Sequence, residues 1–257
     1  MVDRIFQILI TDGQVDESKF SEELVRNISS FRSMYPDARY NRYENQEIIE
    51  FLSQCFSDDV LAAYQGMAPY AFKSDLARYC YLYEYGGLYS DLSYLHIRKI
   101  KPQKKTNMIL FRDIPIHPPW ATSISVMFAK PKSPALARAI SRIVEHHKSQ
   151  YYGLTPLDPT GPYMFGRVLS EVDDWMSTVF GDSRLLSREQ GGRPNIAKVL
   201  PTGEIIAIRN KFNDSSIDEM IGGHSNNYSD IWHAKQVWGE AGKITKIASK
   251  FGAIFGR

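Results

Sequence analysis

The chain has 257 residues, of which 43% are hydrophobic and 23% are charged, values typical of one globular domain with a sizeable core. Its formal net charge of +2 argues against a nucleic-acid partner, because nucleic-acid-binding domains usually carry a strong basic excess. No stretch reaches the roughly 18 apolar residues of a membrane-spanning helix, and 2 cysteines are too few for a disulfide framework, so we expect a cytoplasmic protein.

The first part of the chain predicts strands that alternate with helices. The short apolar run 5–10 is typical of a buried strand, and 38–43 predicts a second strand. Apolar residues at helical spacing predict an amphipathic helix over 17–34, and a further helix is predicted over 45–56. This alternation predicts a mostly parallel sheet flanked by helices.

The second part continues the same pattern as far as a loop-rich tail. Two strands and two helices are predicted over 107–112, 124–129, 134–149 and 162–180. The chain from residue 200 onward predicts loops with short strands. Because no linker or internal repeat interrupts the pattern, we expect an α/β fold with one domain over residues 1–240.

The segment 69–95 combines helix, turn and strand signals with charged residues. Its first part predicts a helix on which Asp75 and Arg78, three residues apart, share a face. Gly86-Gly87 is expected to end this helix, and a short strand then presents Asp91 and Ser93. Alternate residues of an extended chain point the same way, so both side chains are expected to face one ligand beyond the strand's carboxyl end. Taken alone, the Asp75–Arg78 pair also fits an ordinary surface helix pair.

The run SDLARYCYLYEYGGLYSDLSY resembles the DXD-motif sugar transferases of glycosyltransferase family 32. This family reads SD-x-x-RY followed by YGG-[IV]-Y-x-D-x-D, and it includes mannosyltransferases and capsule and lipopolysaccharide sugar transferases. The matching residues are Ser74, Asp75, Arg78, Tyr79, Tyr85, Gly86, Gly87, Tyr89 and Asp91. The resemblance implies a GT-A-like, Rossmann-like fold with a mostly parallel sheet.

Weaker similarities follow the family's order along the chain. Gln7 stands in a run that resembles the opening strand, and Thr160-Gly161-Pro162 resembles a TGP that opens a helix, with Thr160 placed to cap it. Near the end, His233 followed by Trp238 resembles a terminal His…Trp motif.

The resemblance implies transfer of a hexose from a UDP- or GDP-sugar to a hydroxyl of a glycan or lipid-linked acceptor, with retention of anomeric configuration. Asp91, Asp75 and Arg78 would be the catalytic residues, with Asp75 and Arg78 holding the ribose and sugar of the donor. Trp238 would close over the nucleotide, and the backbone near Gln7 would seat the base. The implied donor-binding residues are Gln7, Ile8, Leu9, Asp75, Arg78, Tyr89, Asp91 and Trp238.

The resemblance also implies a divalent cation, Mn²⁺ or Mg²⁺, that bridges the donor phosphates. Its implied protein ligands are Asp91, Ser93 and His233, with Ser93 standing where the motif has its second Asp. Because serine is a poorer cation ligand, three outcomes stay open: weaker metal binding, replacement of the metal by a cation such as Lys235 or Arg209, or an inactive module that only binds sugar or nucleotide.

The C-terminal residues 241–257 predict a basic amphipathic helix with phenylalanine anchors. Such a helix is expected either to lie peripherally on the inner face of an anionic membrane or to dock on the protein core. On the acceptor side, Trp120 and the Tyr151-Tyr152 pair are loop residues that could line the site.

Overall fold

The computed structural model describes residues 1–13, 15–186, 195–210 and 226–239. The predicted amphipathic helix over 241–257 lies outside the described residues. Among the described residues, no helix is both long and apolar enough to cross a membrane.

The first half of the chain forms most of the predicted elements. Its elements are β1 (Arg4–Ile8), the short 3-10 helix η1 (Glu17–Lys19), α1 (Glu22–Met34), β2 (Arg39–Tyr43), α2 (Asn45–Cys55), α3 (Asp58–Gly66), α4 (Tyr70–Tyr85), β3 (Gly87–Ser90) and β4 (Tyr94–His96). The strands and helices predicted over 5–10, 38–43 and 45–56 are confirmed, and the helix predicted over 17–34 begins later, at Glu22. The short elements α3 and β4 were not predicted.

The second half begins as predicted and then departs from the pattern. Its elements are β5 (Met108–Arg112), β6 (Thr122–Ala129), α5 (Pro134–Lys148), α6 (Pro162–Leu169), the 3-10 helix η2 (Asp173–Ser177), β7 (Thr178–Leu186), β8 (Asn195–Val199), β9 (Ile205–Arg209) and α8 (Tyr228–His233). The helix predicted over 162–180 is wrong beyond Leu169, because the run from Thr178 pairs in parallel with β5. Pairing with a distant strand outweighs the local apolar spacing.

Within the described residues, nine strands form one sheet in the order β2-β1-β3-β6-β5-β7-β8-β9-β4. β1 pairs in parallel with both β2 and β3, and β5 pairs in parallel with β7. The remaining pairs are antiparallel: β3 with β6, β6 with β5, β7 with β8, β8 with β9 and β9 with β4. The α/β class is confirmed, but the sheet is mixed, so the predicted mostly parallel sheet is wrong. Two features cause this: β6 is inserted antiparallel between β3 and β5, and β7, β8, β9 and β4 follow one another as antiparallel neighbours.

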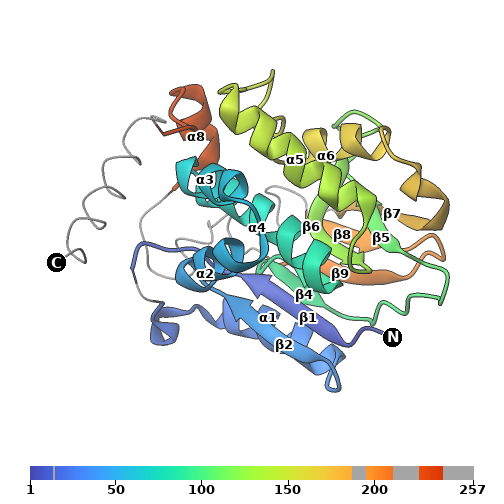
Figure 1. The fold of residues 1–257 in the computed structure, drawn as a ribbon. Coiled ribbons are helices and arrows are strands. Elements are labelled where there is room, and N and C mark those ends of the chain that lie inside the picture. The colour runs from blue at the N-terminus through green and yellow to red at the C-terminus, as the bar shows by residue number, and fades with distance from the viewer. Residues whose placement is uncertain (14, 187–194, 211–225, 240–257) are drawn as a thin grey trace.

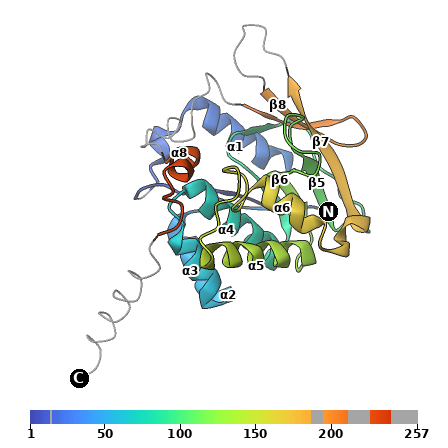
Figure 2. The same cartoon turned by 90° about the horizontal axis from the view of Figure 1, so that it is seen from above.

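Helices cover both faces of the sheet, so alternate strand residues enter two different cores (Figures 1 and 2). Phe6, Tyr89 and Met127 face the larger core, under α2 to α6. Leu88 and Phe128 face the smaller core, under α1. Both faces are therefore apolar, which explains why these strands read as continuous apolar runs rather than as alternating ones.

A glycine pair joins α4 to β3 and sets the direction of the chain entering the site. Gly86 is the C-cap of α4 with φ 66°, and Gly87 has φ 106°, so the predicted helix stop is confirmed. A Cβ on Gly87 would lie 2.6 Å from the carbonyl oxygen of Arg4. The pair thus allows β3 to run directly beside β1.

Candidate active site

The candidate site lies at the carboxyl ends of β1 and β3. These two strands pair in parallel, so their ends lie next to each other. Asp91 directly follows β3, and its backbone N–H donates to the carbonyl of Ser125 on β6 at 2.7 Å. This edge is where ligands bind in open α/β sheets, since loops diverge there around exposed strand ends.

Arg78 of α4 connects the two predicted carboxylates. Its Nη2 lies 2.9 Å from Oδ1 of Asp75, and its Nη1 lies 3.1 Å from Oδ1 of Asp91. Nη1 also donates to the carbonyl of Ile124 at 2.8 Å, and the guanidinium lies 4.6 Å from the centre of the Tyr89 ring. The pair is therefore not an ordinary surface pair, and Arg78 is fixed on several sides.

The two carboxylates differ in burial, and therefore in how accessible each is to a ligand. The Asp75 side chain is 10% exposed, whereas that of Asp91 is 33% exposed. Burial raises the pKa of Asp75 to about 6, although the Arg78 guanidinium and the Thr160 hydroxyl favour its ionised form. Burial opposes the charge of Arg78, but nearby Tyr89, Asp91 and Asp75 raise its pKa above the ordinary value. Asp91 is thus the carboxylate more open to a ligand.

The segment from Asp91 to Ser93 is a turn and not the extended strand that the sequence predicts. The N–H of Tyr94 donates back to the carbonyl of Asp91 at 3.3 Å, which closes the turn. Ser93 is 8% exposed, and its carbonyl accepts from the N–H of Asn210 at 2.7 Å. The alternation argument for a shared side-chain direction is therefore wrong, because a turn rotates each successive side chain.

β1, whose end carries the residues predicted to seat the base, pairs in parallel with β3, the strand that leads to this turn. Gln7 and Ile8 end the strand, and the N–H of Leu9 donates to the carbonyl of Tyr43 at 3.0 Å. Gln7 is fully buried; its Oε1 accepts from the Tyr40 hydroxyl at 3.1 Å, while its Nε2 has no partner in the described structure. Tyr89 is also buried, and its hydroxyl donates to Asp91 at 2.6 Å.

The two predicted residues of the tail occupy different surroundings. Trp238 is 6% exposed, lies 5.8 Å from the His147 ring and donates its indole N–H to the carbonyl of Tyr151 at 2.9 Å. His233 is exposed, and its Nδ1 lies 2.7 Å from the carbonyl oxygen of Ser229 on its own helix. No described contact joins either residue to Asp91. Their roles stay predictions.

The predicted metal site requires side-chain atoms near Asp91 that can coordinate a cation. Within the described ranges, no three His, Cys, Asp or Glu side chains gather closely enough to hold a metal ion. Both described contacts of the Asp91 carboxylate use Oδ1, so Oδ2 faces neither Arg78 nor Tyr89. One carboxylate oxygen suits Mg²⁺ or Mn²⁺ when substrate phosphates and water complete the shell. The residues fit a metal that arrives with the donor.

Lys198 on β8 is a charged residue that the sequence reasoning missed. It is 1% exposed, and its Nζ donates to two hydroxyls, Ser123 at 2.5 Å and Ser183 at 2.8 Å, and lies 5.6 Å from the centre of the Tyr94 ring. Burial lowers its pKa to about 8, and the charges of Asp113 and Asp91 partly oppose that shift. Lys198 therefore carries a buried positive charge that interacts with the charges of Asp113 and Asp91. A lysine within a short apolar strand is the only sequence signal of it.

Thr160 and Tyr228 also reach the site in ways that the sequence did not indicate. The cap of α6 is Gly161, so the predicted capping role of Thr160 is wrong; its hydroxyl donates to Asp75 at 2.7 Å instead. Burial raises the pKa of Tyr228 on α8, and the charge of Asp75 adds to that shift. The Tyr228 ring lies 5.9 Å from the ring of Phe72 on α4, so α8 packs beside the helix that carries Asp75 and Arg78.

Comparison with known proteins places this site in a recognised type of region. Residues 21–112 match the family model described as a glycosyltransferase sugar-binding region containing a DXD motif. The structure is similar to the solved structure "PaToxG Glycosyltransferase", with a TM-score of 0.51 and 16% identity over 66% of this chain and 69% of that chain. No curated protein matches the chain. The matched segment includes Asp75, Arg78 and Asp91, and the fold is that of a glycosyltransferase.

Proposed function

We propose that the protein is a glycosyltransferase that transfers a hexose from a UDP- or GDP-sugar to a hydroxyl of a glycan or glycolipid, with retention of anomeric configuration. The observation that carries the proposal is the Arg78-centred cluster. It joins Asp75 and the more exposed Asp91 at the edge where the parallel strands end. Such a cluster in a DXD-containing sugar-binding region supports a transferase of family 32 type.

In this proposal each residue of the cluster has a separate task. Asp91 would hold the donor diphosphate and its cation, since its Oδ1 alone is used by Arg78 and Tyr89. Asp75 and Arg78 hold the ribose and sugar of the donor, and Tyr89 fixes the Asp91 carboxylate from beneath. The backbone at Leu9, just beyond β1, seats the base. Rigid partners of this kind favour catalysis because they need no reorganisation when charge develops.

Departure of the nucleoside diphosphate concentrates negative charge at the site, and that charge must be neutralised. A bound Mn²⁺ or Mg²⁺, held by Asp91 with Ser93 and His233 as further proposed ligands, would supply Lewis-acid stabilisation. Protein cations add to it. Arg209 on β9 lies opposite Tyr94, the residue after Ser93, and the charge of Lys198 interacts with that of Asp91. Lys235, the other proposed cation, lies 4.5 Å from the Tyr152 ring.

The acceptor is proposed to enter beside the loop between β5 and β6. This loop begins at Asp113, whose N–H donates to the carbonyl of Ala121 at 2.9 Å. It ends in Trp120, which is 42% exposed and lies 5.2 Å from the Tyr163 ring. Exposed aromatic rings of this kind bind sugar faces. Peripheral membrane contact through residues 241–257, in a cytoplasmic protein, is proposed for a lipid-linked acceptor.

A second candidate function is an inactive module that binds a sugar or nucleotide without transfer. Ser93 favours it, because one carboxylate is absent from the expected metal site. The two functions differ in one measurable property: only the enzyme breaks the bond between the sugar and the diphosphate.

The test is calorimetric titration of UDP and GDP, each with Mn²⁺, Mg²⁺ or EDTA, combined with an assay of UDP- and GDP-sugar hydrolysis. Asp91→Ala is expected to lose donor hydrolysis and to weaken nucleotide binding by at least about tenfold, or 1.4 kcal/mol. The matched control is Asp59→Ala, whose exposed carboxylate pairs with Lys148 away from the site.

The outcomes separate the alternatives. Binding of one nucleotide that needs both metal and Asp91 supports the metal-dependent donor site. Binding that ignores EDTA supports neutralisation by protein cations. Binding without hydrolysis of any donor supports the inactive module, and failure of both nucleotides to bind would reject the proposal.

A further inference from the structure

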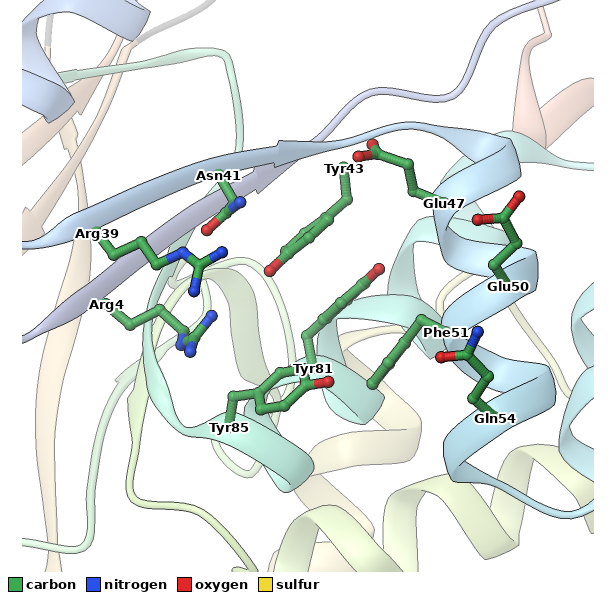
Figure 3. Close-up of a pocket in the computed structure, with 10 residues that line it drawn as sticks. All are labelled: Arg4, Arg39, Asn41, Tyr43, Glu47, Glu50, Phe51, Gln54, Tyr81 and Tyr85. Atoms are coloured by element: carbon green, nitrogen blue, oxygen red, sulfur yellow. The ribbon is translucent and has the colours of Figure 1, made fainter.

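A polar pocket lies at the amino ends of the parallel strands, opposite to the carboxyl ends where Asp91 lies. Arg4 and Arg39 are the first residues of β1 and β2, whereas Asp91 follows the carboxyl end of β3. The pocket lies between these strand starts, α2 and the end of α4, and its volume is about 430 Å³ (Figure 3). That volume is within the range of about 300–1,000 Å³ that small-molecule sites usually have.

One end of this pocket carries two arginines that lack a carboxylate partner. Among the described residues, neither Arg4 nor Arg39 forms a salt bridge; Arg4 lies 4.8 Å from the centre of the Tyr85 ring. Burial raises the pKa of the Tyr43 hydroxyl, and the positive charges of Arg4 and Arg39 oppose that shift. Beside them, the buried Oδ1 of Asn41 has no hydrogen-bond partner in the described structure. The two guanidinium groups favour an anion at this end, and the free Oδ1 of Asn41 can accept a hydrogen bond from a ligand hydroxyl.

The other end of the pocket carries carboxylates from α2. Glu47 and Glu50 lie on the helix across from the arginines, as Figure 3 shows. Glu47 accepts from the N–H of Glu44 through Oε2, and Glu50 accepts from Gln46 through Oε1. The other oxygen of each carboxylate stays available to accept a bond, and a carboxylate binds well to ligand hydroxyls.

The wall between the two ends is rigid and offers polar edges rather than open ring faces. Tyr43 stacks on Tyr81 with centroids 3.8 Å apart, and Phe51 stacks on the other face of Tyr81 at 4.0 Å. Because the faces of Tyr81 are already covered, a ligand base cannot intercalate there. The wall is thus preformed, which lowers the cost of binding, and it suits a ligand rich in hydroxyls.

We propose that this pocket binds a saccharide that carries an anionic group, with the anion on Arg4 and Arg39 and the sugar hydroxyls toward Glu47 and Glu50. The anion is a phosphate or a carboxylate, since both match guanidinium geometry. The site is separate from the Asp91 site, so the inference does not depend on the proposed transferase activity.

The experiment is calorimetric titration of the full chain with glucose 6-phosphate, glucuronate, glucose and inorganic phosphate. At least one anionic sugar is expected to bind with a Kd of about 1 mM or tighter. The variant Arg4→Gln/Arg39→Gln is expected to weaken that binding by at least about tenfold. The charge-matched control is Arg26→Gln/Arg98→Gln, which removes two exposed arginines outside the pocket.

Two more variants keep the test specific. Glu47→Gln/Glu50→Gln is expected to weaken the sugar phosphate but not inorganic phosphate, and Asp91→Ala is expected to leave binding unchanged. Circular dichroism checks folding, and Arg39→Gln alone serves if the double arginine variant unfolds.

The results decide both parts of the proposal. Preference for glucose 6-phosphate or for glucuronate identifies the anion as phosphate or carboxylate. Equal binding of glucose would reject anion recognition, and equal binding of inorganic phosphate would reject saccharide recognition. The proposal is also overturned if no anionic sugar binds, if the arginine variant binds normally, or if Asp91→Ala abolishes binding.

Discussion

Single residues of the candidate site are placed by their neighbours more than by their own preferences. Arg78 would be costly to bury alone, but Asp75, Asp91 and the carbonyl of Ile124 satisfy its donors. The turn after Asp91 is held in the same way: buried Asn27 donates to the carbonyl of Leu92 at 3.1 Å. These bonds fix where the Asp91 carboxylate lies before any ligand arrives.

The buried charge of Lys198 lowers the stability of the folded protein. Its pKa of about 8 in the folded protein lies below the value of 10.5 in the unfolded chain. Between these values the unfolded state binds more protons, so stability contributed by this group rises with pH above about 8 and is lowest at neutral pH. Lys198→Met is therefore expected to raise the free energy of unfolding at about pH 7 by roughly 1–3 kcal/mol and to weaken nucleotide binding.

Urea unfolding at about pH 7 and about pH 9.5 measures the stability change, which should shrink at the higher pH. The hydroxyls left behind keep other contacts, since Ser183 donates to the carbonyl of Arg112 at 2.6 Å. Lys132→Met is the control, because Lys132 is exposed and pairs with Glu84. A lower stability of Lys198→Met at neutral pH would contradict the prediction.

Among the elements, the corner between α4 and β3 matters most for the site. α4 carries Asp75 and Arg78, and β3 leads to Asp91, so the glycine pair between them sets the distance across the cluster. Gly87 combines a positive φ of 106° with a close approach to the backbone of β1. An L-residue at this position would meet both backbone strain and a clash.

Gly87→Ala is expected to lower the free energy of unfolding by about 2–4 kcal/mol and to reduce nucleotide binding. Gly203→Ala is the matched control. Gly203 has φ 86°, but nothing lies within 4 Å of an added Cβ, so only the backbone strain of about 1 kcal/mol should appear. Urea unfolding of both variants measures the difference. Equal losses would show that the close approach to Arg4 has no cost.

The whole molecule depends on strands that are far apart in the sequence. The segment 21–112 that matches the sugar-binding region lacks β6, which pairs with β3 through Leu88–Phe128 and Tyr89–Met127. It also lacks α5, against which α4 packs. The matched region is therefore not a separate folding unit in this structure.

Two truncated chains test this conclusion. Residues 1–112 alone are expected to show no cooperative unfolding transition, because β3 and α4 would expose their apolar partners to water. Residues 1–240 are expected to unfold cooperatively with a midpoint close to that of the full chain, as the predicted domain boundary requires. Circular dichroism during urea titration measures both. A cooperative transition of residues 1–112 would show that the second half is dispensable for folding.

Local sequence patterns were sufficient to predict most of the local elements and the residues of the cluster. Helical spacing, the glycine stop and the SD-x-x-RY…YGG-x-Y-x-D pattern are local, so α4, β3, Asp75, Arg78 and Asp91 could be identified without a structure. Ser93 was identified in the same way. The direction of its side chain was not, because the four-residue turn from Asp91 to Tyr94 is held by Asn27 and Asn210 from distant segments.

The strand directions, the end of α6 and the surroundings of the site could be seen only in the tertiary structure. β6 lies antiparallel between β3 and β5. The segment that begins at Thr178 forms a strand because it pairs with β5, starting at Met108. Local propensity does not encode either pairing. Thr160 contacts Asp75, and Lys198 is buried between Ser123 and Ser183, for the same reason. Pairing and burial are interactions between segments many residues apart, so their energies are absent from any short window of sequence.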